Sequence, residues 1–238
     1  MNIKIKTLLA FSVIIIIILL TLSMTACSLA SYEHFNSGYF QCVDMGDSIK
    51  IIGLTDIGLE LEEIVFPTEI YFKPVDGIQI DDTSGHGFVS EKAKKFFLPS
   101  SVRVISFVDL FGNPDEVRTL LISTVPIKSQ VSKYGLAYVI VPKITFEAYL
   151  QYRTEAIDAA NVTYYYNYSD SPNNGCHWID YLNEGESIKT IPTAPVREGY
   201  AFSGWYTEEE CINLFDFKTT KIVDIEIELY AKWIADIM

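Results

Sequence analysis

The stretch Ile188–Tyr206, together with the segment Leu229–Trp233, constrains this chain more than any other part of its sequence. The two segments contain two of the three tryptophans. Aromatic residues at alternate positions place Tyr200 and Phe202 on one face of a strand and Trp205 on the other. Neither segment contains a paired nucleophile and base or a cluster of metal ligands. The pattern therefore predicts a small β-rich module with an aromatic core and no catalytic chemistry.

The order of prolines, glycines and aromatic residues in these segments resembles the Listeria–Bacteroides repeat, the B-repeat of internalins. The residues that carry the resemblance are Pro192, Pro195, Arg197, Gly199, Tyr200, Phe202, Gly204, Trp205, Tyr206, Asp216, Phe217 and Leu229–Trp233. They extend over about residues 161–234. The resemblance implies a β-grasp-like fold, a surface-exposed bacterial protein and no catalytic activity.

The first 26 residues have the pattern of a lipoprotein signal peptide. Lys4 and Lys6 precede an apolar run, Leu8–Leu22, which is shorter than the roughly 20 residues that span a bilayer. Thr25–Cys27 resembles a bacterial lipobox, which implies that Cys27 carries a lipid and starts the mature protein. An ordinary secretory signal or a single anchor helix is the alternative. We expect export to the extracellular face of the bacterial membrane, with residues 27–37 as a lipid-anchored tether.

The charge balance narrows the class of partner. Without residues 1–26 the chain loses Lys4 and Lys6, so 16 basic residues face 31 acidic ones, a net charge of −15. Such a surface argues against nucleic acid and against electrostatic docking on anionic lipid. The membrane is therefore expected to be contacted through the lipid on Cys27.

Residues 38–160 contain an imperfect repeat of short apolar segments that precede a proline or a serine. The segments are Ile64–Ile70, Phe96–Val102, Leu120–Ser123 and Val139–Pro142. Because proline cannot continue a sheet ladder, the pattern predicts short parallel strands that end at these positions. Repeats of this length indicate a solenoid, in which each unit buries its apolar face against its neighbours.

This region resembles a degenerate leucine-rich repeat of the BspA type. Ile49–Leu54 resembles the strand and turn before the first unit, and Tyr138–Tyr149 resembles the closing unit. Lys73–Glu91 acts as an insert that makes the first period too long. The alternative is an irregular β-rich domain whose prolines are ordinary strand ends.

The expected fold is mainly β with few helices, a leucine-rich-repeat-like solenoid over 38–160 followed by a β-grasp-like domain over 161–238. Helices are expected at Ile144–Ala160 and Glu208–Leu214. In the second domain, Thr163–Tyr168 is the opening strand and Trp178–Tyr181 the return strand.

Two cysteines, Cys176 and Cys211, lie in the second domain, and an exported location permits a disulfide between them. Two buried free thiols are the alternative, and the role of Cys42 is left open. No cysteine motif typical of zinc or redox sites is present.

Aromatic residues are the main candidates for ligand contacts. Tyrosine and tryptophan on an exposed sheet stack on sugar rings or anchor a protein partner. The candidates are Tyr164, Tyr166, Tyr168, Trp178 and Tyr181. The alternative is that these side chains form the core of the module, since small sheets need such cores.

No residue pattern predicts an enzyme, a metal site or a cofactor. The three histidines, His34, His86 and His177, are far apart and belong to no metal-binding or protease motif. The acidic segment around Asp81 and Asp82 fits no calcium loop.

The sequence therefore predicts a non-enzymatic, lipid-anchored cell-surface protein that binds a protein or a glycan in adhesion. A structural spacer or assembly protein of the cell envelope is one alternative. A solute-binding or hydrolytic lipoprotein with a cryptic site is another, and it predicts a deep pocket lined by convergent polar groups.

Overall fold

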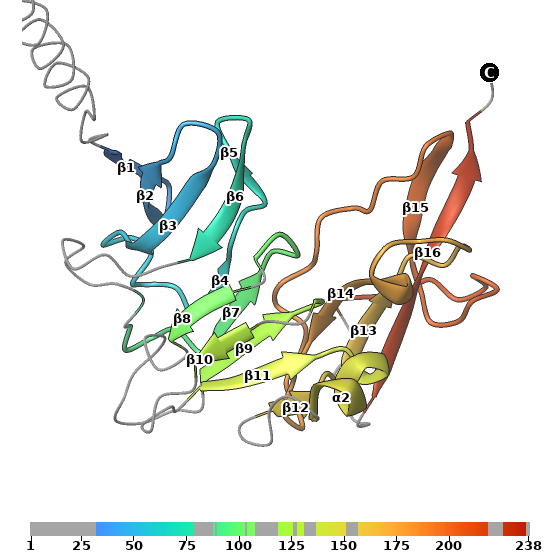
Figure 1. The fold of residues 1–238 in the computed structure, drawn as a ribbon. Coiled ribbons are helices and arrows are strands. Elements are labelled where there is room, and N and C mark those ends of the chain that lie inside the picture. Colours follow the sequence, from blue (N-terminus) through green and yellow to red (C-terminus); the bar gives the residue numbers. More distant parts are fainter. Residues whose placement is uncertain are drawn as a thin grey trace, which may run out of the picture. The chain divides into compact units, whose positions relative to one another are not determined.

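The computed structural model describes residues 32–78, 88, 90–102, 104–107, 119–125, 128–130, 137–150, 157–218 and 226–236. The chain divides into two compact units, Met1–Glu33 and His34–Met238, and the second unit contains the three sheets. Within the described ranges the chain is mainly β with one α-helix (Figure 1). The predicted signal peptide, the lipid-bearing Cys27 and the segment with Asp81, Asp82 and His86 lie outside the described residues.

The first sheet has the strand order β1-β2-β3-β6-β8-β10, and a short strand, β5, pairs antiparallel with the start of β6. The strands are β1 (Glu33–Ser37), β2 (Phe40–Asp44), β3 (Ile49–Leu54), β5 (Glu69–Ile70), β6 (Lys73–Ile78), β8 (Val104–Phe107) and β10 (Lys128–Gln130). The predicted strand at Ile49–Leu54 is confirmed. The predicted tether is corrected at its end, because residues 33–37 form a paired strand whose Phe35 packs against the core. The predicted insert, Lys73–Glu91, begins with β6.

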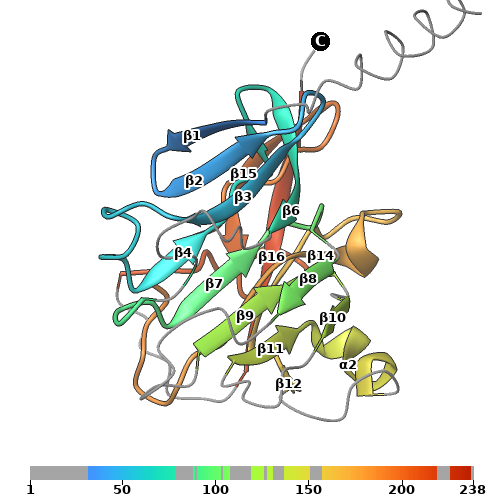
Figure 2. The same cartoon turned by 60° about the vertical axis from the view of Figure 1, so that its left-hand side comes forward.

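The second sheet, with the order β12-β11-β9-β7-β4, is parallel throughout. Its strands are β4 (Glu63–Val65), β7 (Lys95–Leu98), β9 (Thr119–Ser123), β11 (Ala137–Val141) and β12 (Ile157–Ala159). The four apolar segments singled out in the sequence contribute β4, β7, β9 and β11, so the prediction of short parallel strands is confirmed. From β4 to β11 the chain visits the two sheets alternately (Figure 2).

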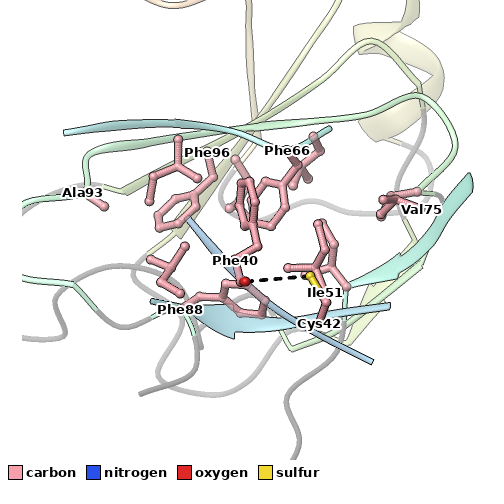
Figure 3. Close-up of a cluster of buried hydrophobic side chains, with 14 of the residues drawn as sticks. Phe40, Cys42, Ile51, Phe66, Val75, Phe88, Ala93 and Phe96 are labelled. Atoms are coloured by element: carbon pink, nitrogen blue, oxygen red, sulfur yellow. Dashed lines mark hydrogen bonds between the residues drawn. The ribbon is translucent and has the colours of Figure 1, made fainter. Parts of the chain in front are cut away.

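The largest core draws side chains from both of these sheets. Phe40 from β2 packs on Phe66, with ring centroids 5.1 Å apart, and Phe66 also contacts Phe88 and Phe96 (Figure 3). Cys42 is fully buried beside them, and burial raises the pKa of its thiol to about 11. The apolar alternate positions of the strands therefore meet in one aromatic-rich interior.

The third sheet carries the C-terminal module, with the order β14-β13-β16-β15. Its strands are β13 (Val162–Tyr165), β14 (Cys176–Asp180), β15 (Tyr200–Tyr206) and β16 (Ile227–Ala235), and a 3-10 turn, η2 (Asn173–Gly175), precedes β14. β13 and β16 are parallel, whereas the β13–β14 and β15–β16 pairs are antiparallel. The predicted opening and return strands are thus confirmed with slightly different ends.

A bulge in β15 corrects the predicted alternation of aromatic residues. Phe202 lies opposite Trp233 and Trp205 lies opposite Ala231, so two residues of β15 face one residue of β16. Gly204, with a φ of 133°, permits this extra residue. Phe202 and Trp205 consequently pack in the same core with ring centroids 5.1 Å apart, instead of on opposite faces.

Two helix predictions are wrong in extent or in kind. The α-helix, α2, spans only Lys143–Leu150, and the strand β12 follows at Ile157–Ala159. Residues 208–214 form turns and a β-bridge instead of a helix, because Cys211 has a φ of 53° and Leu214 bridges Tyr206. The run of glutamates indicated a helix start, but Glu208 accepts hydrogen bonds from Asn213 instead.

The C-terminal module docks on the second sheet through a mixed apolar and ionic contact. Trp178 of β14 stacks on Phe97 of β7, with ring centroids 4.9 Å apart. Lys95, also of β7, donates to the Oδ1 of the fully buried Asp180 at 2.9 Å. Glu63 is 3.5 Å from the same ammonium group. The interface therefore buries charge as well as aromatic surface.

Candidate functional site

Three side chains stand together on the face of the third sheet that points away from the module's core. Side chains alternate between the two faces of a strand, so Tyr164 and Leu229 enter the core while Tyr165, Glu228 and Tyr230 point the other way. In the parallel β13–β16 pair, Tyr165 lies directly opposite Tyr230. The rings stack with centroids 5.2 Å apart. This register places the two aromatic rings side by side on that face.

Both tyrosine hydroxyls are held by one carboxylate. Tyr165 donates to Oε1 of Glu228 at 3.1 Å, and Tyr230 donates to Oε2 of the same residue at 2.9 Å. Burial and the nearby charge of Glu228 raise the pKa of Tyr165 and of Tyr230. The two hydrogen bonds to Glu228 hold both rings in place.

This tyrosine pair forms part of a groove of about 550 Å³, called here the tyrosine groove. Its lining combines aromatic rings with hydroxyl, amide and carboxylate groups. The lining residues are Tyr165, Asn167, Tyr168, Ser169, Ser171, Gly175, Glu209, Glu228 and Tyr230. The volume lies within the range of roughly 300–1,000 Å³ typical of small-ligand sites.

Asn167 connects two walls of the tyrosine groove. Its side-chain amide donates to the carbonyl of Glu209 at 2.9 Å and to that of Ala231 at 3.2 Å. Asn167 has a φ of 56°, a left-handed conformation that asparagine adopts more readily than most residues. It thereby fixes the loop that carries Glu209 against β16.

The five aromatic residues predicted to contact a ligand have different roles in the structure. Tyr168 lines the tyrosine groove, whereas Tyr164 is fully buried in the module's core and is not available to a ligand. Trp178 belongs to the docking contact with Phe97, and Tyr166 packs against His177 with ring centroids 5.0 Å apart. Tyr181 lines a separate cavity.

That separate cavity, of about 150 Å³, lies beside the buried ion pair. Lys95 and Glu63 from the second sheet and Tyr181 and Glu186 from the module line it. A volume this small holds a few waters or one small ion, so it does not provide the deep pocket expected of a solute-binding protein.

Sequence reasoning missed Tyr165, Glu228 and Tyr230. Tyr165 and Tyr230 lie within segments already identified as strands, and simple alternation separates them from their buried neighbours. What the sequence did not show is the parallel pairing of β13 with β16, which brings residues 165 and 230 together.

Arg197 of the repeat motif lies over three aromatic rings. Its guanidinium lies 3.8 Å from the ring centroid of Tyr200, 4.5 Å from that of Tyr168 and 5.9 Å from that of Trp233. Such cation–π contacts hold the segment before β15 against the sheet. Arg197 thus also supports Tyr168 at the rim of the tyrosine groove.

The described cysteines, Cys42, Cys176 and Cys211, are all free thiols, so the predicted bond between Cys176 and Cys211 is not formed. Cys176 is fully buried among apolar side chains of the docking contact, whereas Cys211 lies in the turn after β15, where Asn167 donates to its sulfur at 3.4 Å. Burial raises the pKa of Cys176 to about 12.

Comparison with known proteins assigns the C-terminal module. Residues 161–232 match the Listeria-Bacteroides repeat domain. Internalin H of Listeria monocytogenes is 42% identical over 52 residues, which cover 22% of this chain and 9% of that protein. Two proteins of Evansella cellulosilytica that are named only as membrane proteins are 37% identical over 68 residues, or 29% of this chain. The chain spans at most about a tenth of the length of these relatives.

The matched motif residues now have defined places in the repeat. Phe202, Trp205 and Trp233 build the core, Gly204 makes the bulge and Arg197 lies over aromatic rings. Within the described ranges no group of three or more histidine, cysteine or acidic residues is placed to hold a metal ion. In the same ranges, no helix has the length and apolar character needed to cross a membrane.

Proposed function

We propose that this chain is a non-enzymatic bacterial cell-surface protein whose C-terminal module binds a glycan in the tyrosine groove. The observation that carries the proposal is the aromatic pair Tyr165 and Tyr230, fixed by Glu228 at the side of a groove of ligand size. Rigid aromatic rings supply contact area for the apolar faces of sugars at low entropic cost. The repeat's match to Internalin H supports an exposed location.

The polar groups of the tyrosine groove favour a neutral or amino sugar. Glu209 and Glu228 provide carboxylate oxygens that accept hydrogen bonds from sugar hydroxyl or amino groups. Ser169 and Ser171 add hydroxyls that both donate and accept. Two carboxylates in one groove repel acidic glycans and anionic polymers. The expected ligand therefore carries hydroxyl or amino groups and no phosphate or carboxylate.

The proposal includes an outer location and a modular design. A lipid on Cys27 would attach the chain to the extracellular face of the membrane. We further propose that residues 38–160 form a leucine-rich-repeat-like solenoid and that residues 161–238 form a β-grasp-like domain. The alternation of strands between two sheets supports the first, and the mixed four-stranded sheet supports the second.

The test is a glycan array probed with the chain from Ser28 onward and with its Tyr230→Ala and Glu228→Gln variants. A neutral or amino glycan should bind the parent chain, and Tyr230→Ala should weaken binding by about tenfold or more, as loss of a central aromatic contact does. Glu228→Gln should weaken binding less, because the amide keeps one acceptor oxygen while losing the charge. Acidic glycans should not bind.

Tyr39→Ala is the control, since Tyr39 is an exposed tyrosine in the turn between β1 and β2 and does not line the tyrosine groove. Equal losses in Tyr39→Ala and Tyr230→Ala would show that the groove is not the site. Circular dichroism spectra must first establish that all variants are folded.

A spacer or assembly role is the second candidate. Trp178, Tyr164 and Tyr166 are used in cores and contacts within the chain, which suits a protein built for rigidity. This role predicts that the folded chain binds no glycan on the array. It also predicts that another envelope component co-purifies with the chain after cross-linking in cells.

A further inference from the structure

The turn between β5 and β6 consists of two aromatic residues whose backbone conformation is strained. Ile70 pairs with Lys73, so Tyr71 and Phe72 alone make the turn. Both residues have a positive φ, 51° and 62°. Hairpin turns of this form are normally made by asparagine and glycine, because bulky L residues are strained there. The needs of the hairpin therefore do not explain this pair of residues.

The two rings are also largely in water. Phe72 is 97% exposed and Tyr71 is 69% exposed. Figure 1 shows the turn between β5 and β6 at one end of the first sheet. The ring of Phe72 buries almost no apolar surface, so burial does not favour it, and strained residues persist mainly where they serve a function. We call Tyr71 and Phe72 the aromatic tip.

The aromatic tip lies against the first strand of the described chain. The rings of Phe35, in β1, and Tyr71 have centroids 5.7 Å apart. Phe35 follows Cys27 by eight residues. Eight extended residues span at most about 28 Å. A lipid on Cys27 would therefore leave the bilayer surface within reach of the aromatic tip.

An ion pair lies beside the aromatic tip. The ammonium group of Lys73, the next residue, is 2.6 Å from Oδ2 of Asp44. The tip thus presents aromatic surface next to a neutralised pair. Aromatic rings concentrate in the interfacial layer of bilayers, where an apolar body and a polar edge are both accommodated.

We propose that the aromatic tip inserts into the interfacial layer of the membrane to which the chain is anchored, and so orients the domain on that surface. The proposal rests on the lipid anchor of the proposed function. Because the chain as a whole is acidic, anionic lipid should not favour insertion.

The experiment supplies the anchor chemically. The chain from Cys27 onward, with Cys211→Ser, is coupled through Cys27 to phosphatidylcholine vesicles that contain a maleimide lipid. Phe72→Trp in this chain provides a fluorescent tip. With brominated phosphatidylcholine, this variant should show a blue-shifted component and extra quenching relative to the same chain with Phe72, whose tryptophans all lie in the C-terminal module. Added phosphatidylglycerol should not increase the quenching.

No extra quenching would overturn the proposal and would point to a protein as the partner of the aromatic tip. Because the coupling does not depend on cellular lipidation, this outcome is separable from a failure of the anchor itself. Mass spectrometry of the Cys27 peptide from cells tests the anchor independently.

A second variant asks whether the aromatic residues serve the fold instead. Tyr71→Asn combined with Phe72→Gly keeps a two-residue turn with positive φ and removes both rings. Its melting temperature should rise by a few degrees, since strain is relieved. Hydrogen exchange at the β5–β6 turn should slow on vesicle coupling in the parent chain and not in this variant. A lower melting temperature would assign the rings to the fold and contradict the proposal.

Discussion

Gly204 decides how the aromatic motif of the C-terminal module is used. Its φ of 133° is a backbone conformation that residues with a Cβ atom rarely adopt, and it makes the bulge that turns Trp205 into the core beside Phe202. A Cβ atom at this position would lie 2.9 Å from Cδ1 of Leu214. Leu214 is exposed and its side chain is free to rotate, so most of the cost of a larger residue comes from the backbone.

Gly204→Ala should therefore lower the free energy of unfolding by about 2–3 kcal/mol, measured by urea denaturation. Gly185→Ala is the matched control: Gly185 has a φ of 82° and no heavy atom within 4 Å of an added Cβ, so its loss should be about 1 kcal/mol. Equal losses at the two positions would mean that the bulge tolerates a side chain. Tryptophan fluorescence should also change in Gly204→Ala, because Trp205 is displaced.

At the level of single elements, local sequence patterns predicted most strands, whereas the candidate site depends on how the strands pair. Proline cannot continue a ladder, so the ends of β7 and β11 could be predicted from Pro99 and Pro142. β1 was missed because its sequence is largely polar, and only pairing with β2 defines it. The tyrosine groove was missed because it depends on the parallel pairing of β13 with β16, and no local pattern encodes that pairing.

The docking of β14 on β7 makes a pH-dependent prediction. Burial raises the pKa of Asp180 to about 6, although Lys95 opposes this, because the cost of desolvating the carboxylate exceeds the attraction. A carboxyl group with a raised pKa in the folded state contributes stability below about pH 4, and this contribution is lost as the pH rises through 6. The total change is roughly 3 kcal/mol at most.

The stability of the parent chain relative to Asp180→Asn should accordingly fall between pH 4 and pH 7 in urea denaturation. In Lys95→Met the opposing charge is absent, so the pKa of Asp180 should rise further and the fall should extend to higher pH. An increase of the relative stability over this window would show that the ion pair outweighs desolvation.

At the scale of the whole molecule, the question is whether residues 34–160 and 161–238 unfold together. Two buried thiols report on it separately: Cys42 lies in the core of the first two sheets, and Cys176 lies in the docking contact. Each reacts with a thiol reagent only when its surroundings open, while the half-exposed Cys211 needs no such opening. Because the docking contact buries Phe97 and Ile122 of the second sheet against Ile179 of the module, undocking should cost nearly as much free energy as global unfolding.

In the chain from Ser28 onward, Cys42 and Cys176 should therefore react with the thiol reagent at the same slow rate, and Cys211 should react much faster. Peptide mass spectrometry measures the three labelling rates. Phe97→Ala removes the ring that stacks on Trp178, and should accelerate labelling of Cys176 well before that of Cys42. Faster labelling of Cys176 in the parent chain itself would mean that the module undocks while both halves stay folded. The two halves would then act as independent domains, and the tyrosine groove would be free to reorient relative to the aromatic tip.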